Sequence, residues 1–126
     1  MTSQTPTASL AYLGDAVFEL RVREMLLVQS KNGTSAHMLN KMARKYVSAP
    51  AQAAMYHAIF PTLTEEEQSV IKRGRNLHNT SRAKNAEVAD YRHATGLETL
   101  FGFLYENGDH ARITELFERC VTPCET

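Results

Sequence analysis

Apolar residues recur along the chain at helical spacing, and almost no stretch alternates apolar and polar residues with the period of two that a strand requires. The pattern therefore predicts an all-α protein of about six helices. Residues that cap helices mark where they begin. The expected starts are a cap at Thr7, a cap at Thr34 or Ser35, Ser48 followed by Pro50, a capping box of Thr64 and Glu67, a start near Glu87, and a cap at Asp109.

The sequence also predicts the position of the first helix, the end of the fourth helix and one exposed loop. The first helix, from Thr7 to about Val28, has apolar residues around most of its circumference and should be central. The fourth is expected to end before Gly74, because basic residues fill its last turn. Residues 76–85 lack apolar periodicity and are predicted to form an exposed loop.

Composition favours one globular domain over residues 1–126, with an ordered core of about 8–122. The first ten residues contain no Lys or Arg ahead of an apolar stretch, which does not support a secretory signal and indicates a cytoplasmic protein. The uncharged stretch after Lys45 contains Pro50 and Pro61, so it is not expected to span a membrane. Cys120 and Cys124 are too few for a disulfide framework and are expected as free thiols, with half a zinc site as the alternative.

Two helices each contain one acid among apolar residues: Asp15 in LAYLGDAVFEL (10–20) and Glu98 in ATGLETLFGFLY (94–105). An unpaired buried carboxylate is costly, so each should have a partner. Small neighbours such as Gly14 and Gly102 allow a backbone or ligand to come close. Two converging carboxylates would bind Mg²⁺ or Mn²⁺ together with waters and phosphate oxygens. The alternative pairs Asp15 with an arginine and Glu98 with a backbone donor or another cation.

Residues 72–92 carry six basic and two acidic residues in a chain of zero net charge. Such a segment suits a polyphosphate, and its scarcity of aromatic residues favours a duplex over single-stranded bases. The alternative is a solvated helix end and loop. His93 could assist phosphate binding. The candidate residues for binding such a duplex are Lys72, Arg73, Arg75, Asn76, Arg82, Lys84 and Arg92.

The segment Leu13-Gly14-Asp15-Ala16-Val17 resembles the signature of ribonuclease III, and GLETLFGFLY resembles the second acidic segment of that family. The chain has Ala8, Ala11 and Thr95 where the family usually has further acids, and too few residues follow Val121 for a double-stranded-RNA-binding domain. In these departures the chain resembles mini-ribonuclease III. It also resembles that group in three segments, which are IKRGRN (71–76), KYVSAPAQA (45–53) and KNAEVADYRHATG (84–96).

The resemblance implies a homodimeric, magnesium-dependent endoribonuclease that cleaves double-stranded RNA and leaves a 5′ phosphate and a 3′ hydroxyl. It implies that Asp15 and Glu98 are the catalytic residues and metal ligands, and that the substrate is the large-subunit (23S) ribosomal RNA precursor. The first and fifth helices are candidates for the dimer interface, and a ribosomal protein is a possible stimulating partner. Two alternatives are a noncatalytic RNA-binding or ribosome-assembly module and a protein-interaction domain that uses residues 46–64.

Overall fold

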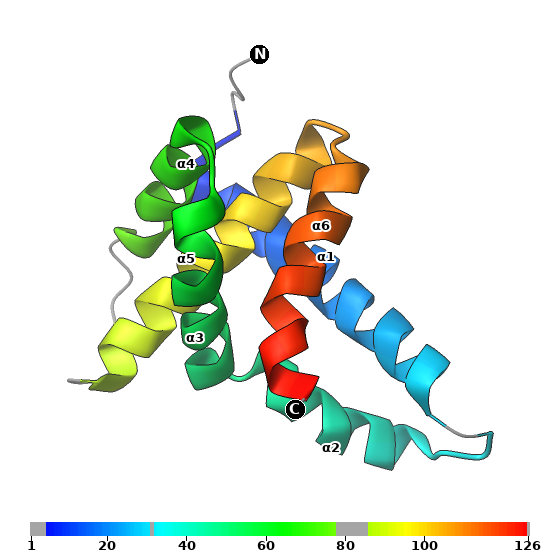
Figure 1. Ribbon diagram of the computed structural model, residues 1–126. Helices are drawn as coiled ribbons and strands as arrows, with labels where there is room; N and C mark the ends of the chain where they lie inside the picture. Colours follow the sequence, from blue (N-terminus) through cyan, green and yellow to red (C-terminus); the bar gives the residue numbers. More distant parts are fainter. Residues whose placement is uncertain (1–4, 31, 78–85, 126) are drawn as a thin grey trace.

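The architecture is all-α, as the periodicity predicts (Figure 1). The computed structural model describes residues 5–30, 32–77 and 86–125, which contain six α-helices, two short 3₁₀ helices and no strand. The elements are α1 (Thr7–Gln29), α2 (Ala36–Val47), α3 (Ala49–Ile59), η1 (Phe60–Thr62), α4 (Glu65–Arg75), α5 (Ala86–Glu106), α6 (His110–Val121) and η2 (Thr122–Glu125).

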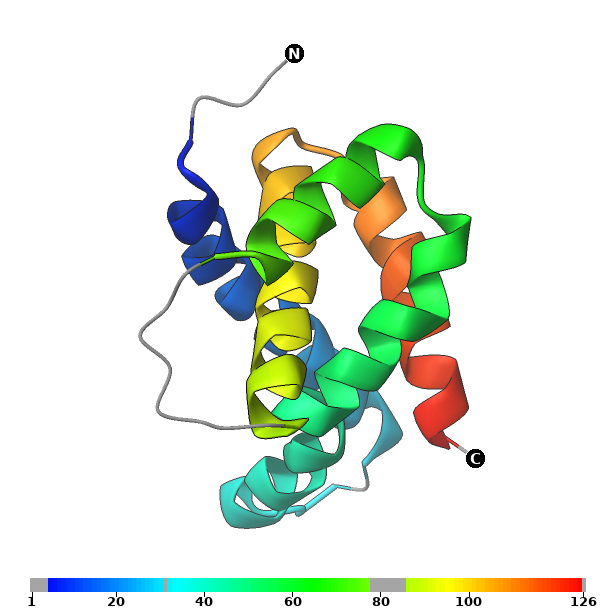
Figure 2. The same ribbon diagram turned by 90° about the vertical axis from the view of Figure 1, so that its left-hand side faces the viewer.

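The central helix is α5, which lies between α1 and the pair formed by α3 and α4 (Figure 2). Leu97, Leu100 and Phe101 of α5 are fully buried. The prediction that the first helix is central is therefore wrong. One face of α1 packs on α5, but its opposite face leaves Tyr12 and Leu20 exposed, because helical periodicity does not show how many neighbours surround a helix.

Glycines allow α1 and α5 to cross with their backbones in contact. A Cβ atom on Gly14 would overlap the carbonyl group of Glu98, and one on Gly102 would overlap the carbonyl group of Leu10. No larger residue fits at either position without moving a helix. The small residues on both sides of the crossing therefore bring the backbones beside Asp15 and Glu98 together, as the sequence suggests.

A second close crossing joins α4 to α5 and corrects the expected end of α4. The helix continues through Gly74 to Arg75. Gly74 is buried, and a Cβ there would lie 2.6 Å from the Cβ of Thr99 and 2.9 Å from the Cα of Gly96. This glycine therefore serves helix packing, which explains why its role as a stop signal is overridden.

Most predicted caps are present. Ser35, Ser48 and Asp109 each accept a hydrogen bond from a backbone N–H in the first turn of their helix, and Thr64 and Glu67 form the expected capping box. Thr7 is the exception, because it is the first helical residue and the N-cap is Pro6, which has no side-chain hydrogen bond to offer.

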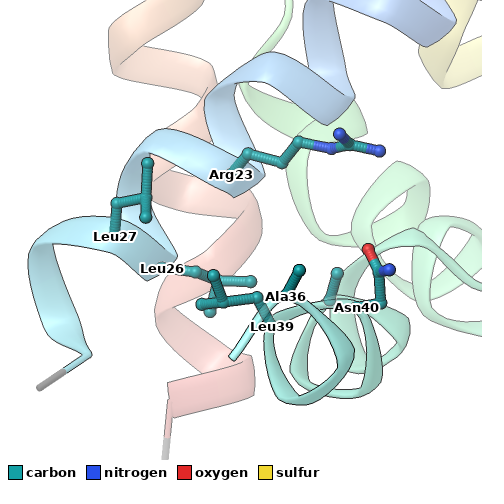
Figure 3. Close-up of a pocket in the computed structure, with 7 residues that line it drawn as sticks. Arg23, Leu26, Leu27, Ala36, Leu39 and Asn40 are labelled. Atoms are coloured by element: carbon teal, nitrogen blue, oxygen red, sulfur yellow. The ribbon is translucent and has the colours of Figure 1, made fainter. Parts of the chain in front are cut away.

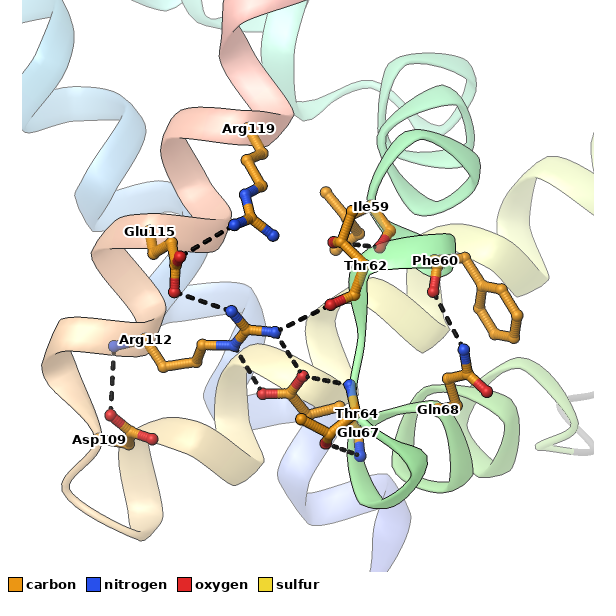
Figure 4. A network of polar contacts seen from close by, with 10 residues as sticks. All are labelled: Ile59, Phe60, Thr62, Thr64, Glu67, Gln68, Asp109, Arg112, Glu115 and Arg119. Carbon is orange, nitrogen blue, oxygen red and sulfur yellow. Dashed lines mark hydrogen bonds and ion pairs between the residues drawn. The ribbon is translucent and has the colours of Figure 1, made fainter.

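A network of ionic and hydrogen bonds ties the start of α4 to α6 (Figure 4). The guanidinium group of Arg112 donates to both carboxylate oxygens of Glu67, at 2.8 and 2.7 Å. It also donates to Glu115 and to the carbonyl oxygen of Thr62. Burial alone would raise the pKa of the Glu67 carboxyl, but hydrogen bonds from Arg112 and Thr64 outweigh this effect and lower it.

Neither a membrane-spanning helix nor a cluster of three metal-binding side chains occurs in the part of the chain that the structure describes. Cys120 is buried on α6. The side chain of Cys124 lies outside the described residues.

Candidate active site

Asp15 of α1 and Glu98 of α5 meet at the glycine-lined crossing, within hydrogen-bond reach of each other. Glu98 is half-buried, whereas Asp15 is exposed rather than enclosed in the core as its apolar neighbours suggested. The two carboxyl groups line a pocket of about 220 Å³. The other residues that line it are Ala8, Ala11, Tyr12, Leu77, Tyr91 and Thr95.

The electrostatics of this pair are those of two acids without a counter-charge. Burial, and then the neighbouring Asp15 carboxylate, raise the pKa of Glu98 to about 8. Among the described residues, no Lys or Arg lies within ion-pair distance of either acid. The alternative that pairs Asp15 with an arginine is therefore not found in residues 5–30, 32–77 and 86–125. With a pKa of about 8, the Glu98 carboxyl group is mostly protonated at pH 7 in the metal-free protein, and it makes a hydrogen bond with Asp15.

Gln52 of α3 is a residue at this site that the sequence reasoning missed. Its side chain is almost completely buried and makes a hydrogen bond to Glu98 that favours the ionised carboxylate. Glu19, one turn after Asp15 on α1, opposes this effect with its negative charge. The available signal was an uncharged polar residue in the otherwise apolar run APAQAAM, at a position that faces the core.

Ala8, Ala11 and Thr95, the positions where further acids were expected from the family resemblance, line the same pocket as Asp15 and Glu98. The hydroxyl of Thr95 donates to the carbonyl oxygen of Tyr91 at 2.9 Å. Within the described residues, no third His, Cys, Asp or Glu completes a cluster around the two acids. The pocket therefore offers two carboxylates and neutral walls.

The structure separates the candidate RNA-binding residues into groups. Arg75, Asn76 and Arg92 line one pocket of about 320 Å³, together with Val88, Ala89 and His93. The ammonium group of Lys72 lies instead 5.6 Å from the centre of the Phe60 ring. Arg73 is exposed and lines neither pocket. Arg82 and Lys84 lie outside the described residues.

A third pocket, between the carboxyl-terminal part of α1 and α2, has a different character (Figure 3). It has a volume of about 160 Å³ and is lined mainly by apolar side chains, including Leu26, Leu27 and Leu39. It contains no acid, and Leu26 lies roughly 16 Å along the helix axis from Asp15. It is therefore separate from the two-carboxylate site.

Comparison with known proteins agrees with this helical fold and acidic pair. Residues 8–109 match the family model described as the Ribonuclease III domain. This match makes the chain an endoribonuclease of the ribonuclease III type, a class that takes double-stranded RNA as its substrate.

Similar proteins narrow the assignment. Mini-ribonuclease 3 of Brevibacillus brevis is 47% identical over 116 residues, which cover 92% of this chain and 85% of that protein. Mini-ribonuclease 3 of Enterococcus faecalis is 44% identical over 115 residues, which cover 90% and 86%. A crystal structure of a protein from Fusobacterium nucleatum superimposes with a TM-score of 0.81 at 29% identity, over 95% of this chain and 94% of that one. The chain belongs to the ribonuclease III family, in its mini-ribonuclease III group.

Proposed function

We propose that this endoribonuclease hydrolyses double-stranded RNA with Asp15 and Glu98 as its catalytic acids and with a divalent metal ion as cofactor. The observation that supports the proposal is the meeting of two carboxyl groups, from helices far apart in sequence, in an open pocket with no basic partner among the described residues. A noncatalytic RNA-binding module is the second candidate. It would gain nothing from acids in such a pocket, because they repel phosphate.

The donor atoms fit Mg²⁺, with Mn²⁺ as a substitute. Magnesium is commonly held by one or two carboxylates, several waters and phosphate oxygens of the substrate, so two acids and neutral walls are sufficient. Asp15 and Glu98 would hold the ion. When bound, it would lower the pKa of a coordinated water and stabilise the charge that develops on the phosphate. Glu98 must release its proton to become a ligand, so metal binding is coupled to proton release.

The chain's own side chains prepare the site for this chemistry. Gln52 holds the carboxyl group of Glu98 from the buried side, and Asp15 faces the solvent from which the substrate arrives. Ala8 and Ala11 leave space in the pocket for RNA and water. The products would be a 5′ phosphate and a 3′ hydroxyl, as the family resemblance implies.

The proposed substrate is the double-stranded end of the large-subunit (23S) ribosomal RNA precursor in the cytoplasm, with a ribosomal protein as a possible stimulating partner. The chain would act as one catalytic domain over residues 1–126 and as a homodimer, because each site cuts one strand. The candidate RNA-binding residues, six of them basic, would supply much of the RNA affinity; they are Lys72, Arg73, Arg75, Asn76, Arg82, Lys84 and Arg92.

The test is incubation of the purified protein with an end-labelled RNA duplex, with and without magnesium. We expect magnesium-dependent cleavage, and its loss in Asp15→Asn and Glu98→Gln while both variants still bind the duplex. Glu118→Gln, at an exposed acid on α6, is the matched control and should cleave like the wild type. Cleavage that survives both substitutions would reject Asp15 and Glu98 as the catalytic pair.

A further inference from the structure

A second polar pocket lies where the end of α4 meets the amino-terminal half of α5. Its polar walls are Arg75, Asn76, Arg92 and His93, and none of the described residues that line it is an acid. It is next to the two-carboxylate pocket, just beyond the end of α4 and along α5. Leu77 and Tyr91, which line that pocket, are the sequence neighbours of Asn76 and Arg92. A ligand long enough to cross the intervening wall would therefore reach both.

Arg75 is held in place by neutral groups, so its charge is not neutralised. Its Nε donates to the side-chain oxygen of Asn76 at 3.2 Å, and a terminal nitrogen donates to the hydroxyl of the buried Tyr56 at 3.3 Å. Among the described residues, no carboxylate lies within ion-pair distance of Arg75. Arg112 shows the contrast, because both of its bonds to Glu67 are ionic.

The other polar side chains of the pocket are those of Asn76, Arg92 and His93. Because the side-chain oxygen of Asn76 accepts from Arg75, its amide nitrogen is the group left for a ligand. Arg92 brings a second guanidinium group from α5, and it too lacks an acidic partner within the described ranges. His93 is fixed as a wall, with Nδ1 2.7 Å from the carbonyl oxygen of Ala89 and its ring against Tyr56.

We propose that this pocket is a phosphate subsite, in which Arg75 and Arg92 together hold one backbone phosphate of the RNA, other than the phosphate being cut. The inference rests on the proposed function, since it concerns the same duplex. Two guanidinium groups and an amide donor around an acid-free pocket match a group with several acceptor oxygens and negative charge. Such a contact fixes where the duplex lies without reading its sequence.

The test is equilibrium binding of a fluorescently labelled RNA duplex in EDTA, measured over a range of salt concentrations. Arg75→Gln and Arg92→Gln should each weaken binding and reduce the slope of log K against log salt by about one. The double variant should reduce that slope no further than either single variant, because all three lose the same phosphate. Arg73→Gln, which removes a charge from the same helix outside the pocket, should instead add its effect to that of Arg75→Gln.

Two controls separate this inference from folding and from the proposed function. Arg44→Gln on α2 should leave affinity and slope unchanged, and thermal unfolding should show that Arg92→Gln, at an exposed position, folds like the wild type. The subsite is rejected if Arg75→Gln and Arg92→Gln bind the duplex like the wild type, or if their effects on the salt slope add. Neither result affects the proposed function, which is tested separately by cleavage of the duplex by the wild type. A wild type that neither binds nor cleaves the duplex would reject both.

Discussion

Gly14 of α1 lies directly against the backbone of Glu98 in α5, so closely that a Cβ atom on Gly14 would overlap the Glu98 carbonyl oxygen. The contact joins the two halves of the candidate active site, since Asp15 follows Gly14 in the chain. Fold stability and the distance between the two carboxyl groups therefore depend on the same glycine.

We expect Gly14→Ala to reduce the free energy of unfolding by about 3 kcal/mol, because the obstacle is backbone that cannot rotate away. The same change should impair cleavage more than RNA binding, since it separates Asp15 from Glu98. Urea denaturation and single-turnover cleavage measure the two effects. Ser9→Ala, at an exposed position on the same helix, is the control and should change stability by less than about 0.5 kcal/mol. A Gly14→Ala protein with wild-type stability would contradict the close crossing.

The ion pair of Arg112 and Glu67 should contribute to stability but not to catalysis. In Arg112→Leu the carboxylate of Glu67, with 8% of its side chain exposed, loses its ionic partner. Breaking a buried pair in this way costs about 3–5 kcal/mol. Urea denaturation should show this loss, and Glu67→Gln combined with Arg112→Leu should recover part of it. Cleavage measured well below the unfolding temperature should stay near the wild-type rate, and a large loss there would link α6 to the active site.

The pair of carboxyl groups should make the metal-free protein less stable at alkaline pH. Burial and Asp15 raise the pKa of Glu98 from 4.5 to about 8, so between these values the folded state binds more protons than the unfolded state. The free energy of unfolding therefore falls as pH rises through this window, and the full loss is reached above it. After allowance for solvent relaxation, we expect a loss of about 2–4 kcal/mol.

Urea denaturation in EDTA at about pH 5 and about pH 9 measures this dependence, and Glu98→Gln should abolish most of it because the variant has no carboxyl group to ionise there. Glu118→Gln should keep the wild-type pH profile. If Glu98→Gln retained that profile as well, the raised pKa would belong to another group.

The helices and their caps were predictable because they depend on residues close in sequence. Ser35, Ser48, Thr64 and Asp109 cap helices through bonds to backbone groups three residues away. The pairing of Asp15 with Glu98 was anticipated from the small residues beside each acid and from the resemblance to ribonuclease III.

Other features depend on which elements meet, and the local pattern does not contain that information. Three features follow from the crossing of helices that are remote in sequence. They are the exposure of Asp15, the burial of Gln52 beside Glu98 and the interior position of Gly74. Charge counting likewise grouped Lys72 with Arg75, but the structure directs the first toward Phe60 and the second toward Tyr56.

The exposed apolar face of α1 is the candidate contact surface of the proposed homodimer. Leu20 is 56% exposed and shares a pocket with Tyr105 of α5, so the first and fifth helices both contribute to this surface. We expect Leu20→Glu to convert a wild-type dimer into a monomer, because it places a charge in an apolar contact. Sedimentation equilibrium measures the change. Met38→Glu, which charges an exposed apolar residue on α2, should leave the dimer intact, and a monomeric wild type would exclude this interface.

A substitution at Ala11 tests whether Asp15 and Glu98 are the only side chains that the protein provides as ligands for the proposed metal ion. Ala11 lies one turn before Asp15 on the same face of α1 and lines the same pocket, so Ala11→Glu would bring a third carboxylate to the pair. Without metal, the added repulsion should lower the free energy of unfolding. With magnesium, the extra ligand should tighten binding on the order of tenfold, as measured by titration calorimetry. Ala11→Gln matches the size without the charge, and equal magnesium affinity in the two variants would mean that the ion does not bind between Asp15 and Glu98.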